Sequence, residues 1–459
     1  MRSTPRTALL LVLTLASPLA GRGPVARAEP PPPQAPAFEL QGIGRGILLR
    51  LEPNFRWKAR DEARSGVLGT LAGTTREFES IEIQLGADRA VLLAPQRSAY
   101  EAYGIQREVE RGVSQVADVK PDLCVVRRRS LFGDSVVAVA VKQVGRTVVF
   151  ARGECGKKDE AGLVKLVKSV VAGASATGDD IDGWIPQEVK TAWTHTPASD
   201  LVVVEDGTVD AARRDEILKA VRLGHGAAKR LLSASWNTPF APVVRITANR
   251  DLFSHLAARR DLRDADAVYV PYASELLVSP RGPVPDAARI AREASAQAMH
   301  YALGAADAEP VLSGLARQAA AQAAGVAAGE LLPDDEERAL ARVKGKQAKS
   351  WYRLLMMPTL VHFLSEDPEE RAIDAELAVV YLGSPAAAAG RSGLTAWIAA
   401  FRKVGHPDAA SEAAVAALDP ARCDAEYWAY WGPRADPPKK PGDKSGGAPA
   451  KPGSKPAGK

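Results

Sequence analysis

A few side chains with metal-binding or acid–base chemistry lie between residues 286 and 318. Glu293 and His300 are seven positions apart, so a helix would place them near the same face. An acid such as Asp307 or Glu309 could complete a site with them, since a catalytic zinc is held by three protein ligands and keeps one open position. The alternative is that His300 is packed or hydrogen-bonded on an alanine-rich helix, the usual state of a single histidine.

The motif around Glu293 resembles the active-site helix of gluzincin zinc peptidases with its metal ligands substituted. Residues 292–296 read REASA where that family carries HExxH, whose two histidines lie one turn apart beside a glutamate general base. Residues 310–316 read PVLSGLA and resemble the WLxEGxA segment that carries the family's third ligand. The resemblance implies that Arg292 and Ala296 stand at the two histidine positions and Glu293 at the position of the general base.

These substitutions remove the chemistry that zinc requires. Ser313, at the third ligand position, offers a neutral hydroxyl in place of a carboxylate. Arg292 carries a fixed positive charge that repels a cation, and Ala296 has no donor atom. The resemblance therefore implies a vestigial site, and we expect no catalytic residue, no metal and no cofactor. The alternative is an active hydrolase with an unrecognised or rearranged site, for which Glu293 and His300 are the candidates.

Hydrophobic periodicity predicts the elements that would hold this site. They are a strand, a long helix, a strand, a short helix, a strand pair or bent strand, and the motif helix, at 201–204, 211–232, 243–248, 251–258, 267–279 and 285–304. Helical segments follow, separated by a charged, solvated stretch at 333–342, and are expected at 310–329, 351–364, 373–382, 395–404 and 411–418. This order, over residues 198–431, resembles a gluzincin or peptidase MA-like domain. It implies a thermolysin-like unit with a small mixed sheet and a helical C-terminal lobe.

Residues 267–279 resemble the edge strand that lies over the active-site groove in such domains. The resemblance implies a groove lined by Tyr269, Tyr272 and the segment from Glu275 to Val278. A groove of that kind could hold an extended peptide by strand addition. We therefore expect a non-catalytic binding or scaffold role, with an extended peptide or a component of the cell envelope as the partner.

A separate α+β domain is expected at residues 38–174, ahead of a glycine-rich linker at 175–197. Runs rich in Val, Ile or Phe predict strands at 38–51, 78–85, 123–128, 135–143 and 147–152, the last two as a hairpin with its turn near Gly145. Leu163, Leu166, Val167 and Val170 predict one helix packed on the sheet, at 160–171. This antiparallel sheet with a closing helix resembles PsbP-like domains.

The N-terminus predicts export. Basic residues precede a short apolar run, and Ala26-Arg27-Ala28 has the pattern of a signal-peptidase site, so residues 1–28 read as a signal peptide. The apolar run is too short to span a bilayer, and the mature chain is expected to have no transmembrane segment. A Pro-rich spacer follows at 29–37, and the Pro, Gly and Lys composition of 432–459 predicts a disordered tail.

The overall charge of +5 comes from the two ends of the chain. The signal peptide contributes four Arg and no acid, and residues 434–459 contribute seven basic and two acidic side chains, so the rest carries about −4. A body of that charge has no general attraction for phosphate backbones, and we expect no specific nucleic-acid binding. Cys124 and Cys155 could form a disulfide in an oxidising compartment, with free buried thiols as the alternative.

Overall fold

The computed structural model describes residues 37–39, 46–52, 54–59, 67–74, 81–89, 93–109, 114–130, 133–177, 181–186, 188–233, 235–257, 265–305, 308–356 and 367–436. The expected signal peptide, residues 29–36 of the spacer and residues 437–459 of the tail lie outside the described residues. Asp307, one of the acids considered as a zinc ligand, also lies outside them. The described chain combines helices with antiparallel and mixed sheets, which confirms the α+β class.

The first part is built on an antiparallel sheet in the order β3-β4-β5-β9-β8-β7-β6. Its strands are β3 (Phe55–Ala59), β4 (Val67–Gly73), β5 (Glu82–Arg89), β6 (Ser114–Lys120), β7 (Leu123–Ser130), β8 (Gly133–Val144) and β9 (Thr147–Gly156). A smaller sheet joins β1 (Ala37–Glu39), β2 (Ile47–Arg50) and β10 (Ala174–Ala176). The expected hairpin is confirmed, since Val144 of β8 pairs with Thr147 of β9 across a turn at Gly145, whose φ is 54°.

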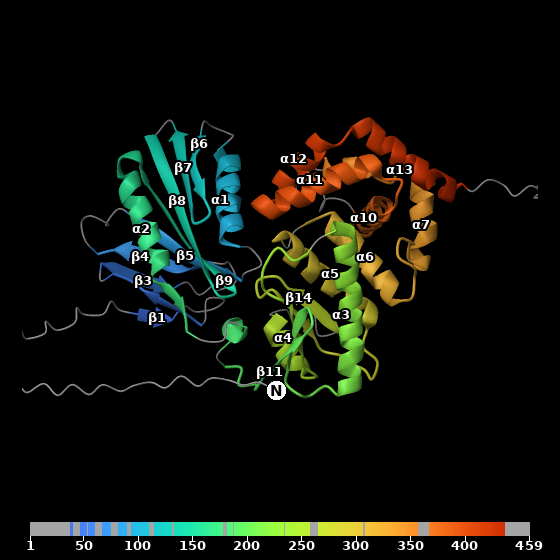
Figure 1. Cartoon of the computed structure of the whole chain (residues 1–459), viewed down its shortest axis with the longest axis horizontal. Coiled ribbons are helices and arrows are strands. Elements are labelled where there is room, and N and C mark those ends of the chain that lie inside the picture. Colours follow the sequence, from blue (N-terminus) through green and yellow to red (C-terminus); the bar gives the residue numbers. More distant parts are fainter. Residues whose placement is uncertain are drawn as a thin grey trace, which may run out of the picture. The chain divides into compact units, whose positions relative to one another are not determined.

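Two helices cover opposite faces of the larger sheet (Figure 1). Helix α2 (Glu160–Ala172) lies where the sequence predicted it and buries Leu163 and Leu166 against one face. Helix α1 (Ala94–Val109) packs Ala102 and Ile105 against the other face, where a single-helix domain was expected to have none. The prediction missed α1 because its sequence is largely polar and presents few aliphatic side chains at helical spacing.

The second part is built on a mixed sheet in the order β11-β12-β13-β15-β14. Its strands are β11 (Thr194–Ala198), β12 (Leu201–Glu205), β13 (Val243–Ile246), β14 (Ala267–Val270) and β15 (Glu275–Val278). The three central strands are mutually parallel, and β11 and β14 are antiparallel edges. The small mixed sheet is thus observed, and residues 267–279 form the expected strand pair.

Helices α3 (Ala211–Leu232) and α5 (Ala287–Leu303) pack on one face of this mixed sheet, and α4 (Arg250–Ala257) packs on the other. Trp184, in the short turn η4 (Asp182–Trp184), joins the core on the α4 side. Ordered elements therefore occupy part of the segment expected as a linker, including β11, which belongs to the mixed sheet.

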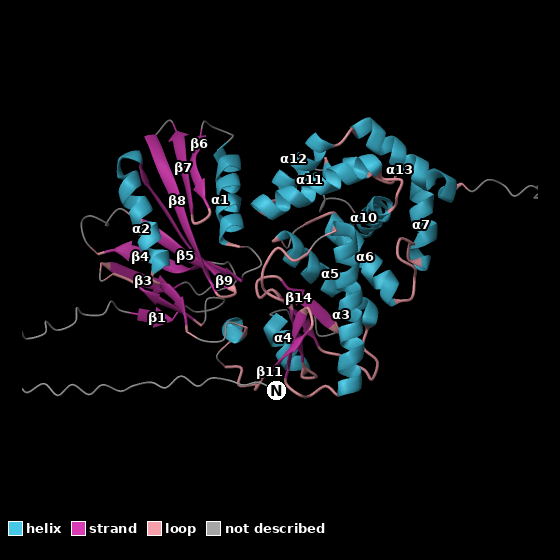
Figure 2. Ribbon diagram, in the orientation of Figure 1, coloured by secondary structure: helices cyan, strands magenta, loops and turns pink. Residues whose placement is uncertain are grey.

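Helices make up the rest of the described chain (Figure 2). They are α6 (Val311–Ala323), α7 (Pro333–Lys344), α8 (Trp351–Leu355), α10 (Pro368–Gly383), α11 (Ala388–Val404), α12 (Pro407–Ala417) and α13 (Pro420–Ala435). Trp351, Trp397 and Trp431 are fully buried in their shared core. The stretch at 333–342, expected to be solvated, forms α7, because Ala339 and Val343 give it a buried face.

Cys124 and Cys155 are both free. Cys124 faces the α1 side of the sheet and Cys155 the α2 side, so the sheet itself separates the two thiols. Within the described ranges, no single helix has the length and apolar composition to cross a membrane; the pair α10 and α11 meets those criteria only jointly, with a bend of 104° between them.

Candidate functional site

The motif helix α5 is defined at both ends by local contacts. Asp286 caps its first turn, with a side-chain oxygen that accepts from the backbone N–H of Arg289 at 2.9 Å. Gly304 closes the last turn in the left-handed region at φ 77°, and its N–H donates to the carbonyl of His300 at 2.7 Å. Between these caps the helix carries four of the residues singled out from the sequence.

Glu293 is held by two partners. One carboxylate oxygen lies 3.1 Å from Nη2 of Arg289, one helical turn away, and the other accepts the backbone N–H of Tyr269 at 3.0 Å. The side chain is 16% exposed. Both oxygens are therefore engaged, and the N–H of Tyr269 on the edge strand β14 is already bonded to α5.

Arg292 and Ser313 lie in the surroundings of the same carboxylate, Glu309. The hydroxyl of Ser313 donates to Glu309 Oε1 at 2.9 Å, and its backbone N–H donates to Oε2 at 3.2 Å. Burial raises the pKa of Glu309, while the bonds from Ser313 and the positive charges of Arg371 and Arg292 act in the opposite direction. Ser313 thus bonds directly to Glu309, and Arg292 acts on the same carboxylate through its charge.

Ala296 is the third expected ligand position. It is partly buried and packs on the aliphatic core between α5 and the mixed sheet. A methyl group in that place contributes packing and offers no atom to a cation. The helix thus directs a small apolar side chain to the position where the implied motif would carry a histidine.

His300 forms a buried pair with Tyr269, whose hydroxyl hydrogen-bonds to Nδ1 of the imidazole. Burial lowers the pKa of His300 to about 3, so the ring is neutral, and burial raises the pKa of Tyr269 well above its ordinary value. Tyr269 therefore contacts Glu293 through its backbone and His300 through its hydroxyl. The described residues contain no group of three His, Cys, Asp or Glu side chains that could hold a metal ion.

The residues expected to line a peptide groove are largely enclosed. Val278 is fully buried and Glu275 is 1% exposed, because β15 lies between β13 and β14 in the sheet. Tyr269 is also buried, and the hydroxyl of the partly buried Tyr272 donates to the carbonyl of Leu256 at 2.9 Å. An extended peptide therefore has no access along β15, and the expected groove is wrong at Glu275 and Val278.

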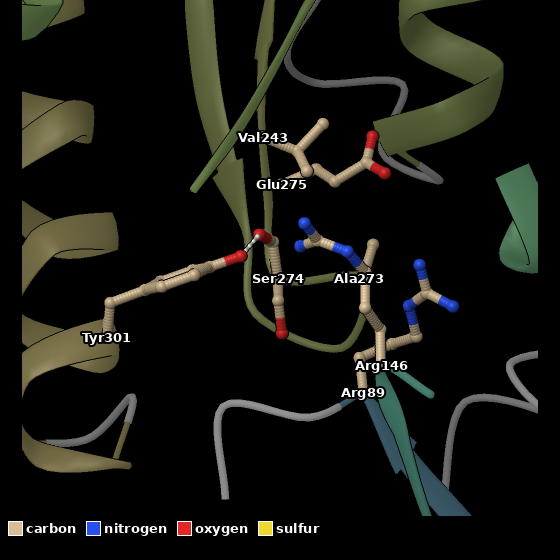
Figure 3. A pocket seen from close by; sticks show the side chains of 7 residues that line it. All are labelled: Arg89, Arg146, Val243, Ala273, Ser274, Glu275 and Tyr301. Atoms are coloured by element: carbon tan, nitrogen blue, oxygen red, sulfur yellow. Dashed lines mark hydrogen bonds between the residues drawn. The ribbon is translucent and has the colours of Figure 1, made fainter. Parts of the chain in front are cut away.

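Glu275 faces a small cavity (Figure 3). Tyr301 donates its hydroxyl to the carbonyl of Ser274 at 3.0 Å, and the side chains of Arg89 and Arg146 lie on the other side of Ser274. The volume is about 10 Å³, the size needed for a single water molecule. The cavity leaves room for solvent and none for a peptide.

A buried ionic network behind this cavity has no counterpart in the sequence predictions. The guanidinium of Arg245 in β13 contacts Glu275 at 2.8 Å and Asp182 at 2.8 Å. Asp182 also lies 3.1 Å from Nε2 of His195, and the indole N–H of Trp184 donates to Glu275 at 2.8 Å. The one available signal was an arginine and a glutamate inside two otherwise aliphatic strands, VVRI and ELLV.

Comparison with known proteins gives little beyond this geometry. No family model matches the chain, and no curated protein matches it. Solved structures with partial likeness include the Ran-binding protein Mog1p of Saccharomyces cerevisiae, with 12% identity, covering 31% of this chain and 96% of that chain at a TM-score of 0.22. PsbP of Synechocystis has 9% identity, covering 35% of this chain and 99% of that chain, also at 0.22.

A protein of Bacteroides thetaiotaomicron has 9% identity, covering 63% of this chain and 78% of that chain at a TM-score of 0.19. At such TM-scores the likenesses carry no argument about this chain. PsbP is the family that residues 38–174 resemble in sequence pattern, and none of these three structures is described as a peptidase.

Proposed function

We propose that this chain is an exported, non-catalytic protein whose residues 198–431 have a gluzincin-like peptidase fold with a lost zinc site. The proposal rests mainly on the contacts of Ser313, which donates both its hydroxyl and its backbone N–H to Glu309, in surroundings that include the positive charge of Arg292. The anionic group at this place, Glu309, is already engaged by Ser313 and has cationic neighbours, which disfavours binding of a divalent cation.

The element order supports the fold part of the proposal. A mixed sheet with an antiparallel edge strand carries α5 on one face, α6 follows α5 directly, and helices complete the unit. In a gluzincin the corresponding two helices would supply the three ligands. Here they carry Arg292, Ala296 and Ser313 instead.

Without a metal-bound water and with Glu293 engaged by Arg289 and Tyr269, the chain has no activated nucleophile at this site. We therefore assign it a binding or scaffold role in the compartment outside the cytoplasm. Strand addition at the vestigial site is disfavoured, because the N–H of Tyr269 already donates to Glu293 and β15 is buried. The partner would therefore be recognised elsewhere on the molecule.

Metal analysis of the purified full-length chain tests the proposal. The protein, prepared without chelators and dialysed against zinc-containing and then zinc-free buffer, should retain far less than one zinc per chain. Retention of one zinc per chain, lost in a Glu293→Gln or His300→Gln variant, would establish the alternative of a rearranged hydrolase site. The matched control is His255→Gln, which changes an exposed histidine on α4.

Export is tested separately. We expect the chain isolated from outside the cytoplasm of an expressing bacterium to begin at Glu29, after the Ala26-Arg27-Ala28 pattern. N-terminal sequencing reads this directly. A chain that stays in the cytoplasm with Met1 intact would contradict the proposed location.

A further inference from the structure

An open groove lies on the α2 face of the first sheet, away from the vestigial site. It has a volume of about 660 Å³ and is formed between strands β6 and β7 and the first turns of α2. Helix α2 packs mainly on β8 and β9, and the groove opens beside it along the neighbouring pair β6 and β7. The volume falls within the range of ligand sites in proteins.

The floor of the groove is aliphatic. Leu123 and Val125 alternate along β7 toward the α2 face and are 5% and 4% exposed, and Val164 of α2 forms part of the wall. The residues that line the groove in the described chain include no aromatic side chain. An aliphatic floor suits an aliphatic side chain and offers no platform for stacking a nucleobase.

The groove also carries an excess of positive charge, because four of its lining residues are basic and two are acidic. Lys120 pairs with Asp118 at 2.7 Å, and Arg127 pairs with Glu160 at 2.7 Å, so these charges are partly compensated. The remaining two basic residues, Lys157 and Lys158, lie in the short 3-10 turn Lys157–Asp159 that precedes α2.

Lys157 has a long contact of 3.5 Å with Asp134 and acts electrostatically on Glu160, and both lysines are exposed. Lys158 makes no hydrogen bond or ion pair with any described residue. Two ammonium groups therefore stand beside the aliphatic floor with little internal compensation, and an anionic ligand can engage them without breaking a short ion pair.

We propose that this groove binds a short acidic peptide segment that carries aliphatic side chains. Its carboxylates would meet Lys157 and Lys158, and an aliphatic side chain would contact the partly buried Val164 above Leu123 and Val125. A flat anionic membrane fits less well, because the apolar floor is recessed and the headgroups of a bilayer could contact only the rim of the groove. The inference concerns a different sheet from the vestigial site and stands whether or not that site binds zinc.

The test uses the full chain and a short fluorescent peptide that alternates glutamate with leucine, followed by fluorescence anisotropy. We expect saturable binding that weakens as salt is raised, since exposed charges are screened. Lys158→Glu should weaken binding about tenfold or more, because it places a like charge against the peptide. Val164→Asp should weaken it as well, by adding a carboxylate to the groove wall.

The matched control is Lys219→Glu, which makes the same charge change at an exposed lysine on α3 and should leave binding unchanged. Peptides with lysine in place of glutamate, or with serine in place of leucine, should bind weakly or not at all. Equal effects of Lys158→Glu and Lys219→Glu would overturn the proposal. Binding of phosphatidylglycerol vesicles that depends on Lys158, with no binding of the peptide, would also overturn it and assign the groove to a membrane surface.

Discussion

Single side chains decide the chemistry of the proposed vestigial site. Glu293 keeps the residue type of a general base, yet Arg289 and the N–H of Tyr269 engage both of its oxygens. His300 keeps a metal-ligand type, yet it is buried and hydrogen-bonded to the Tyr269 hydroxyl. Residue type alone therefore overstates the reactivity of this helix, and the contacts of each group define its role.

The burial of His300 predicts a pH dependence of stability. Its pKa is about 3 in the folded protein against an ordinary value of 6.5, so the unfolded chain binds a proton at intermediate pH that the folded chain does not. Stability must then fall as the pH drops below 6.5 toward 3. Between about pH 7 and about pH 5, this single group should cost about 2 kcal/mol of unfolding free energy.

Urea unfolding of the wild type and of His300→Leu at both pH values measures the contribution of His300 to this loss of stability. Between these two pH values the free energy of unfolding should fall by about 2 kcal/mol less in the variant than in the wild type, whatever the stability of the variant at neutral pH. His225, whose pKa burial lowers to about 4, acts in the same direction and remains in both proteins as an internal reference. Identical pH dependence in the two proteins would show that His300 takes up a proton in the folded state.

At the residue scale, the sequence anticipated part of this arrangement. The option of a packed or hydrogen-bonded His300 is the one observed: its imidazole bonds to Tyr269 and, among the described residues, belongs to no group of three potential metal ligands. Glu309 was considered only as a metal ligand. Its bonds to Ser313, four residues further along, form a local contact at the start of α6 that the sequence reasoning missed.

At the element scale, close packing of helices determines where the site residues lie. Gly224 in α3 faces the backbone of α5, and a Cβ at this position would lie 2.2 Å from the carbonyl oxygen of Ala291. The same Cβ would lie 2.8 Å from Cβ of Ala294. The two helices can approach this closely only because both sides of the contact are small.

Gly224→Ala should therefore destabilise the protein by about 1–3 kcal/mol, since the helices must separate to admit the methyl group. Gly226→Ala is the matched control in the same helix, where a Cβ meets only the mobile end of Arg230 at 3.4 Å. The control should be neutral or stabilise by up to about 1 kcal/mol, through helix propensity. Chemical denaturation compares them, and equal effects of the two substitutions would contradict the packing argument.

The buried pair between β13 and β15 gives a prediction for the mixed sheet. Arg245→Met leaves Glu275, which is 1% exposed, without its cationic partner. The substitution should lower the free energy of unfolding by about 3–5 kcal/mol. Arg214→Met removes a partly exposed partner of Glu205, and should cost at most about 1 kcal/mol. Thermal and urea unfolding measure both. A small effect of Arg245→Met would mean that solvent reaches Glu275.

Elements with a clear apolar periodicity were predictable, and polar ones were not. Helices α3 and α5 and strands β12 and β13 lie close to their expected ranges, because each buries a regular aliphatic face. Strands β3, β4 and β6 of the first sheet were missed, as was α1. Their sequences mix polar, glycine and apolar residues without the strict alternation that marks a strand.

At the scale of the whole molecule, the hydrophobic periodicity of the sequence does not specify the order of the strands in a sheet. The placement of β15 between β13 and β14 turned an expected groove wall into buried structure. The pairing of β9 with β5 likewise places strands far apart in sequence side by side. Such pairings depend on tertiary packing, so the sequence predicted the elements of the site better than its accessible surface.

We propose that α5 and α6 carry the positions of a zinc site whose ligands have been replaced. The direct test restores the ligands in the full chain as R292H/A296H/S313E and measures zinc binding by isothermal titration calorimetry. We expect one zinc per chain for this variant, and much weaker binding for R292H/A296H, which retains Ser313 and so lacks the third ligand. Failure of the folded triple variant to bind zinc more tightly than the wild type would contradict the gluzincin-like arrangement of α5 and α6.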